Sequence, residues 1–495
     1  MNLFLIILFL ILYSLITSAF NKKTLKIFII ISILFVIFLY FFCEKKFFHT
    51  ESFLPAKNIN CYYLCCNYYN LLSDSLKKYK LYISDNINYD EKVFINKGKQ
   101  PLLDTSIYKG KVYLYFGITP VLLFYLPFNS FTNLYLTDKF LVFILSCFIF
   151  LLSLFLIKKV LENITELTEI PQNVIILSIF LVGFCNLLPF LLIRSAIYEV
   201  AITTAVFLLL FSFCLFFYYL KIKNTKKQNI LNFCLASTLC LAVGARPHYV
   251  LFIPIFFFFI ILLKYRETKN IKDTIYTTVI FLIPCLFYGS IIALYNYFRF
   301  DSIFEFGWRL QINPINQIEF KPTFQEFWLG LKNNFFVLPS INEPTFFSLT
   351  KTFGHRIGKD YITGVFWTCP IIMLLLFIPK FLKQIYNKNI NIFIFILLIT
   401  VTIFINIIVV SFAGMMIRYI FEYLFLMIIL SLIIFLFYIG EQPDKHIKNF
   451  FNCLFIFIFF ISLFLNISLL FCTENFLTHD YLKNTYYSKA VKFLF

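Results

Sequence analysis

The feature that most constrains this chain is a succession of long apolar runs separated by short polar turns. Most runs have about the 17–25 residues that a helix needs to cross the hydrocarbon core of a bilayer. Such a succession predicts an all-α polytopic membrane protein with about 12 transmembrane helices. The predicted spans are 3–19, 25–43, 139–157, 174–193, 196–219, 230–243, 248–263, 275–297, 363–379, 390–411, 416–438 and 449–471.

Composition supports this class and excludes others. The chain has 495 residues, of which 61% are hydrophobic and 14% charged, and no soluble fold buries that much apolar surface. A net charge of +18 would suit a nucleic-acid partner. The lysines, however, stand in short clusters between the apolar runs, as the distribution of charge in membrane proteins requires. We therefore expect no nucleic-acid partner.

The basic clusters predict which side of the membrane each turn faces. With twelve spans they all fall on one side, which the positive-inside rule makes the cytoplasm. The clusters are Lys22, Lys23 and Lys26; Lys158 and Lys159; Lys221, Lys223, Lys226 and Lys227; Lys264, Arg266, Lys269 and Lys272; Lys380, Lys383 and Lys388; and Lys445 and Lys448.

This alternation closes only if the apolar stretch 112–128 does not cross the membrane. Pro120 and Pro127 interrupt it, and proline breaks a helix because it lacks the backbone N–H. We interpret it as a segment that dips into the membrane from the extracytoplasmic side. All 495 residues then form one integral membrane domain with two large extracytoplasmic loops, at 44–138 and 298–362.

Acidic residues of the first loop are candidates for a general base. Asp74 lies in Tyr68–Ile83, whose apolar residues share one helical face and predict a short amphipathic helix on the membrane surface. Asp104 directly precedes the segment that is expected to dip into the membrane. A carboxylate near the bilayer surface can take a proton from a sugar hydroxyl. We favour Asp104 and keep Asp74 as the second candidate; both could instead be solvated loop acids.

Three arginines stand at span ends on the extracytoplasmic side, away from the basic clusters. They are Arg194, Arg246 and Arg418. A guanidinium offers a planar fork that suits a phosphate group, so we predict that these residues bind one. The alternative is that they anchor their helices at the membrane interface.

Other polar residues near these arginines are candidates for the same binding site. Glu199 enters a span by about one turn, where an acid is costly and indicates function. His248 follows Arg246 in a turn stiffened by proline, and Arg309 lies in an aromatic segment of the second loop that suits a sugar face or a membrane interface. Glu422 is four residues after Arg418, a spacing that allows them to pair on one helix.

These motifs occur in the same order in a group of bacterial multi-pass membrane proteins, and that group resembles the GT-C glycosyltransferases. The GT-C enzymes include the protein mannosyltransferases and the lipid A aminoarabinose transferase. The resemblance rests on Tyr68–Tyr82, LLDTSIYKGKVYLYFGITPVLLFYLPF at 102–128, RSAIYEVA at 194–201, ARPH at 245–248, FEFGWRLQ at 304–311 and RYIFEY at 418–423.

The resemblance implies a membrane glycosyltransferase of the bacterial inner membrane whose active face is extracytoplasmic. Such an enzyme takes a sugar from a polyprenyl-phosphate carrier, using an acidic loop residue and basic residues that hold the phosphate. We expect membrane lipid as a further partner and no cofactor. No metal site is predicted, although a divalent cation is left open.

The alternative is a transporter or flippase of lipid-linked sugars that performs no chemistry. It would share the basic residues but would need a polar path on both sides of the membrane and pseudo-symmetric halves. The sequence shows no internal repeat and no nucleotide-binding motif. The polar residues inside spans gather on one side, which favours the enzyme.

Overall fold

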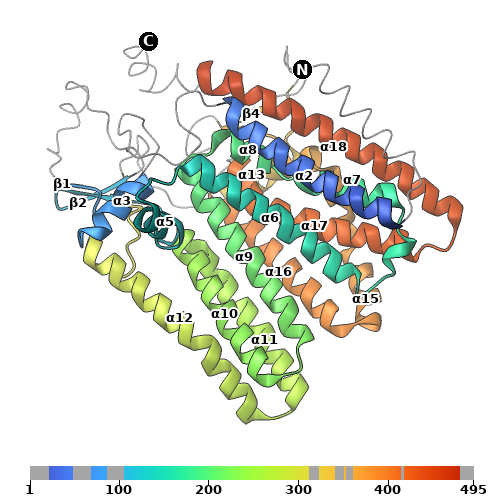
Figure 1. Ribbon diagram of the computed structural model, residues 1–495, viewed down its shortest axis with the longest axis horizontal. Helices are drawn as coiled ribbons and strands as arrows, with labels where there is room; N and C mark the ends of the chain where they lie inside the picture. Colours follow the sequence, from blue (N-terminus) through green and yellow to red (C-terminus); the bar gives the residue numbers. More distant parts are fainter. Residues whose placement is uncertain are drawn as a thin grey trace.

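The protein is a mostly helical bundle with a small β-sheet at one end, as its computed structural model shows (Figure 1). The structure describes residues 22–47, 68–85, 105–311, 323–340, 350–352, 360–413 and 417–479. Within these ranges, ten helices are long and apolar enough to cross a membrane. The chain is therefore a polytopic membrane protein, as its apolar runs predicted.

Ten of the predicted spans coincide with these ten helical segments, and the predicted span at 3–19 lies outside the described residues. The segments comprise α2 (Lys22–Phe47), α6 (Asp138–Leu161), α7 (Gln172–Phe184) with α8 (Leu188–Arg194), α9 (Ile197–Lys221), α10 (Thr225–Ala245), a 3-10 turn (Pro247–Leu251) with α11 (Phe252–Thr268), α12 (Ile271–Phe300), α16 (Ile390–Ala413), α17 (Ile417–Glu441) and α18 (Lys445–His479).

The predicted span at 363–379 differs from a single continuous α-helix. It consists of the short α14 (Val365–Thr368), a 3-10 helix (Pro370–Phe377) and the start of α15 (Ile378–Lys388). The proline at each junction explains the breaks, because Pro370 and Pro379 have no N–H to donate to the preceding turn.

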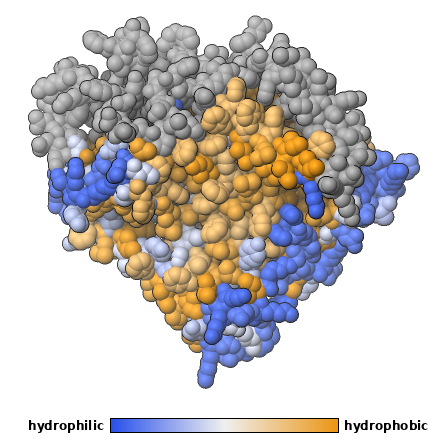
Figure 2. Space-filling view, in the orientation of Figure 1, coloured by the Kyte–Doolittle hydropathy of each residue, from blue (hydrophilic) through white to orange (hydrophobic). Residues whose placement is uncertain are grey.

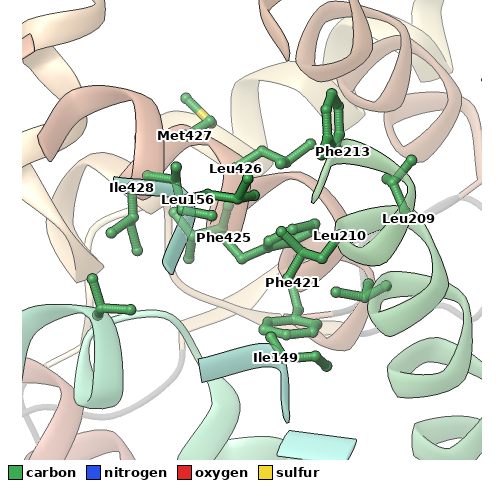
Figure 3. Packing of buried hydrophobic residues seen from close by; sticks show 14 of the residues in the cluster. Ile149, Leu156, Leu209, Leu210, Phe213, Phe421, Phe425, Leu426, Met427 and Ile428 are labelled. Carbon is green, nitrogen blue, oxygen red and sulfur yellow. The ribbon is translucent and has the colours of Figure 1, made fainter. Parts of the chain in front are cut away.

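Helix α17 forms the centre of the bundle. Its apolar residues are buried on every side, which is the pattern of a helix surrounded by other helices. Figure 3 shows Phe421 and Phe425 of α17 packed among Leu210 and Phe213 of α9 and Ile149 of α6. In contrast, α12 exposes most of its apolar residues, so it presents the lipid-facing surface of a peripheral helix.

The basic turns of the chain lie together at one end of the bundle. Lys221 of the α9–α10 turn donates to Asn163 of the α6–α7 turn. Lys388 donates to the backbone oxygen of Ile164, with an Nζ–O distance of 3.3 Å. Lys448 lies 3.5 Å from a carboxylate oxygen of Glu169, which joins a further turn to the group. Figure 2 shows hydrophilic side chains at the lower right of the molecule, next to the apolar surface of the helices.

This clustering leads to a topology prediction. A reporter fused after Lys223 or Lys269 is expected to be cytoplasmic, because basic turns are retained on that side. A reporter fused near Asp90 or Gln325 is expected to be extracytoplasmic. Paired enzymatic reporters that are active on only one side of the membrane make the measurement. Cytoplasmic activity of the fusion at residue 90 would contradict the predicted orientation.

A three-stranded antiparallel sheet lies at the other end of the bundle. It comprises β1 (Ser84–Asp85), β2 (Thr105–Tyr108) and β3 (Lys111–Leu114), in the order β1-β3-β2. Lys109 and Gly110 connect β2 to β3 and have φ angles of 47° and 74°. Positive φ at both positions is the geometry of a type I′ turn, which matches the twist of the two strands it joins. The turn therefore sets the register of the hairpin.

The chain after β3 forms a short apolar helical segment. Val121–Tyr125 is a single π-helical turn that continues into α5 (Leu126–Thr132). The helical part, Val121–Thr132, is shorter than a membrane-spanning helix. The immersion of 112–128 in the membrane surface, and the two extracytoplasmic loops, remain predictions.

Candidate functional site

Segments that the sequence analysis singled out meet at the sheet end of the bundle. Gly117, in the segment after β3, lies so close to the C-terminal end of α10 that a Cβ atom built on it would be 2.0 Å from the backbone oxygen of Gly244. The ring of Phe116 packs against that of Tyr198, with 4.8 Å between their centroids. The turn at 244–248 and the start of α9 therefore both border this segment.

Glu422 is the centre of a buried polar cluster at this point. Its Oε1 accepts a hydrogen bond from Arg246 Nη2 at 2.5 Å, and its Oε2 lies 2.8 Å from His248 Nε2. The glutamate side chain is 0% exposed, whereas those of Arg246 and His248 are 17% and 22% exposed. The carboxylate is thus shielded from solvent, while its two partners face the more open side.

Arg418 lies next to this cluster without joining the ion pair. Its guanidinium stacks on the ring of Tyr198 at 3.9 Å and lies 5.4 Å from that of Tyr419. The side chain is buried, and Nε and Nη1 have no hydrogen-bond partner in the described part of the chain. Arg246 lies 5.1 Å from the same Tyr419 ring, so the two guanidiniums share this aromatic neighbour.

The partner of Glu422 is the main correction to the sequence analysis. The spacing allowed Glu422 to pair with Arg418, but the observed partners are Arg246 and His248. An i,i+4 spacing allows a pair but does not require it, and here the turn after α10 brings Arg246 and His248 to the carboxylate. Arg418 instead reaches Tyr198 on the neighbouring α9.

Glu199 lies near this group but has a local structural contact. Its Oε2 accepts a hydrogen bond from the backbone N–H of Ala196 at 3.1 Å, which is half of a capping box at the start of α9. The negative charge of Glu199 also interacts electrostatically with the guanidinium of Arg418. Arg194 ends α8, and its side chain lies outside the described part of the structure. Its predicted role in phosphate binding therefore remains a prediction.

The two candidate bases from the first loop are not seen at the cluster. Asp104 lies outside the described residues. Asp74 belongs to the predicted short helix, α3 (Tyr68–Lys77), where its carboxylate accepts a hydrogen bond from Tyr135 at 2.9 Å. Asp74 therefore has a contact that orders the loop, and its role as a base remains a prediction.

Helix α3 nevertheless borders the cluster through a different residue. Tyr69 is buried and stacks on Tyr125, with ring centroids 5.1 Å apart. Burial is the main cause that raises the pKa of the Tyr69 phenol, with an addition from Asp138 that Arg246 partly opposes. The Tyr69 hydroxyl points to the backbone oxygen of Ile197, at 3.4 Å, at the start of α9.

The aromatic segment of the second loop docks onto the sheet. Ser106 donates to the backbone oxygen of Gly307 at 2.7 Å, and the N–H of Ile107 donates to that of Leu310 at 3.0 Å. Lys109 and Tyr108 both donate to Asp301, and these hydrogen bonds hold the pKa of its carboxyl below the ordinary value. Asp301 is therefore ionised at neutral pH, and its hydrogen bonds hold the second loop against the hairpin.

Arg309 is exposed on this docked loop, and no described contact joins it to the Glu422 cluster. Its predicted part in substrate binding remains a prediction. Among the described residues, no group of three or more His, Cys, Asp or Glu side chains is arranged to hold a metal ion.

Sequence reasoning missed two polar residues that order this end of the bundle. Arg299, at the end of α12, donates to the backbone oxygen of Leu114 at 2.9 Å and stacks on Tyr295 at 3.8 Å. It thereby ties α12 to the strand that leads into Gly117. Asn406 of α16 donates to the backbone oxygen of Glu422 at 3.0 Å. The available signal was a polar residue within or at the end of a long apolar run.

No protein-family model matches the chain, and no curated protein matches it significantly. Two solved structures of the Archaeoglobus fulgidus oligosaccharyltransferase are matched. The apo form has a TM-score of 0.49 and 13% sequence identity, and AglB in complex with an inhibitory peptide and a dolichol-phosphate has 0.47 and 12%. Each match covers 91% of this chain and 56% of the other, so this chain spans little more than half the length of those proteins.

Proposed function

We propose that this protein is a membrane glycosyltransferase that moves a sugar from a polyprenyl-phosphate carrier to an acceptor at the sheet end of the bundle. The observation that carries the proposal is Arg418. A buried guanidinium with unpartnered N–H groups is costly in a folded protein, and an anion is the ligand that would satisfy it.

A lipid phosphate fits this position better than a soluble anion. Arg418 stands in the first turn of a membrane-spanning helix, so it lies where a span ends. Arg246 lies beside it and also has an unpartnered Nε in the described part of the chain. Two guanidiniums next to each other would hold the phosphate and balance the negative charge that it gains when the sugar leaves.

The position of the buried charges favours an enzyme over a transporter. Arg246, His248, Arg418 and Glu422 gather at one end of the bundle, and the middle of α17 is packed with apolar side chains (Figure 3). A transporter of a polar headgroup needs polar groups along a path to the other side.

The direct test is a transfer assay with a labelled polyprenyl-phosphate sugar on membranes with and without the protein. We expect label to move from the lipid fraction to an acceptor only when the protein is present. Appearance of the intact labelled lipid in the opposite leaflet without transfer would identify the transporter instead and overturn the proposal.

The anion site leads to a prediction of opposite effects on binding and stability. Arg418→Met is expected to weaken binding of polyprenyl phosphate by roughly 10- to 100-fold, because a hydrogen bond to a charged group contributes about 1.5–3 kcal/mol. The same change is expected to leave thermal stability equal or higher, since it removes a buried charge with unpartnered donors.

Arg418→Lys serves as the matched variant in the same measurements. It keeps the charge but loses the fork, so binding is expected to recover only in part. Equal affinity in all three proteins would assign Arg418 a purely structural role. Destabilisation of Arg418→Met in the absence of ligand would point the same way, because it would mean that the stacked guanidinium stabilises the fold.

A further inference from the structure

The Glu422–His248 pair has the arrangement of a carboxylate that orients an imidazole. An ionised carboxylate only accepts hydrogen bonds, so the 2.8 Å contact requires that His248 Nε2 carries the proton. In the neutral imidazole the lone pair is then on Nδ1. The described hydrogen bond of the His248 ring is the one at Nε2, and the side chain is 22% exposed.

Arg246 supports the ionised state of Glu422 that this hydrogen bond requires. It donates to the other carboxylate oxygen, which stabilises the ionised form of Glu422 and leaves it as an acceptor toward His248. The carboxylate can then stabilise an imidazolium without taking up the proton itself, as in a carboxylate–histidine pair that acts on a nucleophile. The backbone supports the same geometry, since Asn406 fixes the carbonyl of Glu422 and Pro247 begins the turn that holds His248.

His248 differs from the cations around it. Arg246 and Arg418 do not lose their protons in proteins, whereas an imidazole exchanges one near neutral pH. Only Pro247 separates His248 from Arg246 in the chain, so a proton acceptor and a phosphate-binding cation occur in one short turn.

We propose that His248 is the general base of the transfer reaction and that Glu422 is its positioning residue. This inference rests on the proposed function. His248 Nδ1 takes the proton of the acceptor hydroxyl while the acceptor oxygen forms its bond to the anomeric carbon of the sugar. The bond from that carbon to the phosphate oxygen breaks, and its electron pair leaves with the lipid phosphate toward Arg418 and Arg246. The imidazolium then returns its proton to water.

The charged and titratable groups around this pair belong to several elements. Besides Arg246 and Glu422, they are Tyr249 in the turn of His248, Arg418 and Tyr419 on α17, Tyr198 and Glu199 on α9, Tyr115 after β3, and Tyr69 on α3. The proposed step uses the lone pair on His248 Nδ1, so these groups surround the atom that receives the proton.

The experiment compares purified wild-type protein with His248→Asn, His248→Ala and Glu422→Gln in the labelled-donor assay over a range of pH. For His248→Asn we expect kcat to fall by about 10²-fold or more, with affinity for polyprenyl phosphate nearly unchanged. The pH profile of kcat should differ between the wild-type protein and this variant. Added imidazole should restore part of the activity of His248→Ala, and His446→Asn, on the exposed far end of α18, is the matched control.

Glu422→Gln keeps the size of the side chain but can no longer stabilise the imidazolium, so kcat is expected to fall while His248 is still present. Wild-type turnover and an unchanged pH profile in His248→Asn would overturn the assignment of the base and leave the proposed function intact. A His248→Asn protein that loses polyprenyl-phosphate binding would likewise overturn it, by making His248 a binding residue. Absence of transfer by the wild-type protein would overturn both proposals.

Discussion

Replacing Glu422 by alanine is expected to lower the free energy of unfolding by about 3 kcal/mol. The change leaves Arg246 largely buried without its carboxylate, and removing one partner of a buried pair typically costs about 3–5 kcal/mol. We expect the lower end, because the Arg246 side chain is 17% exposed and can draw some water. Unfolding in mixed micelles with increasing denaturing detergent gives the measurement.

Two further variants show whether the lost stability comes from the uncompensated charge. In Glu422→Ala combined with Arg246→Met, the orphaned cation is gone, so most of the stability should return while transfer activity stays lost. Glu441→Ala is the matched control on the same helix. Its pair with Lys388 is exposed to solvent, and such pairs contribute about 0–1 kcal/mol. Equal stability of Glu422→Ala and Glu441→Ala would contradict the central position of Glu422.

Replacing Gly117 by alanine is expected to reduce transfer activity by about 10²-fold. The added Cβ would lie 2.0 Å from the backbone oxygen of Gly244 and 2.8 Å from that of Ala245, closer than real Cβ atoms come to other atoms. Because backbone lies on both sides of this contact, one segment must move by about 1 Å, and such a displacement can cost about that factor when it reaches a catalytic group. Overpacking should also destabilise the protein by about 1–3 kcal/mol.

The glycines of the chain provide a graded control series for this experiment. At Gly244 the added Cβ would meet the side-chain oxygen of Thr119 at 2.4 Å, which can rotate away, so Gly244→Ala should be milder. At Gly289 on α12 nothing lies within 4 Å, so Gly289→Ala should be neutral. Kinetics and thermal unfolding of the three variants test the order. Normal activity of Gly117→Ala would show that the two segments do not pack as described.

The helices of this protein follow directly from local hydrophobicity. Each of the ten long helices coincides with an apolar run, because a helix satisfies its own backbone and needs only a side-chain pattern that lipid or neighbouring helices accept. The break at Pro370 could also have been predicted, since proline removes a backbone donor wherever it occurs. The type I′ turn at Lys109 and Gly110 is equally local.

The composition of the candidate site was only partly predictable. Arg246 and Arg418 could be recognised because a charge at the end of an apolar run is costly and therefore conspicuous. Arg299 was missed, although the same signal marks it, and its contact with Leu114 became evident only from the structure. The preference for Asp104 and Asp74 as the base remains a prediction that the described residues do not test.

The sequence by itself determined the membrane-spanning class of the chain, most of its helices and the residues at their ends, because these depend on side chains within a few positions of one another. Only the tertiary structure decided that Glu422 pairs with Arg246 and His248, which are 176 and 174 residues away, and that Gly117 meets Gly244. The physical reason is that pairing depends on the direction in which each side chain leaves its helix and on how closely two backbones approach. Both are properties of helix packing, which brings residues together whatever their separation in the chain.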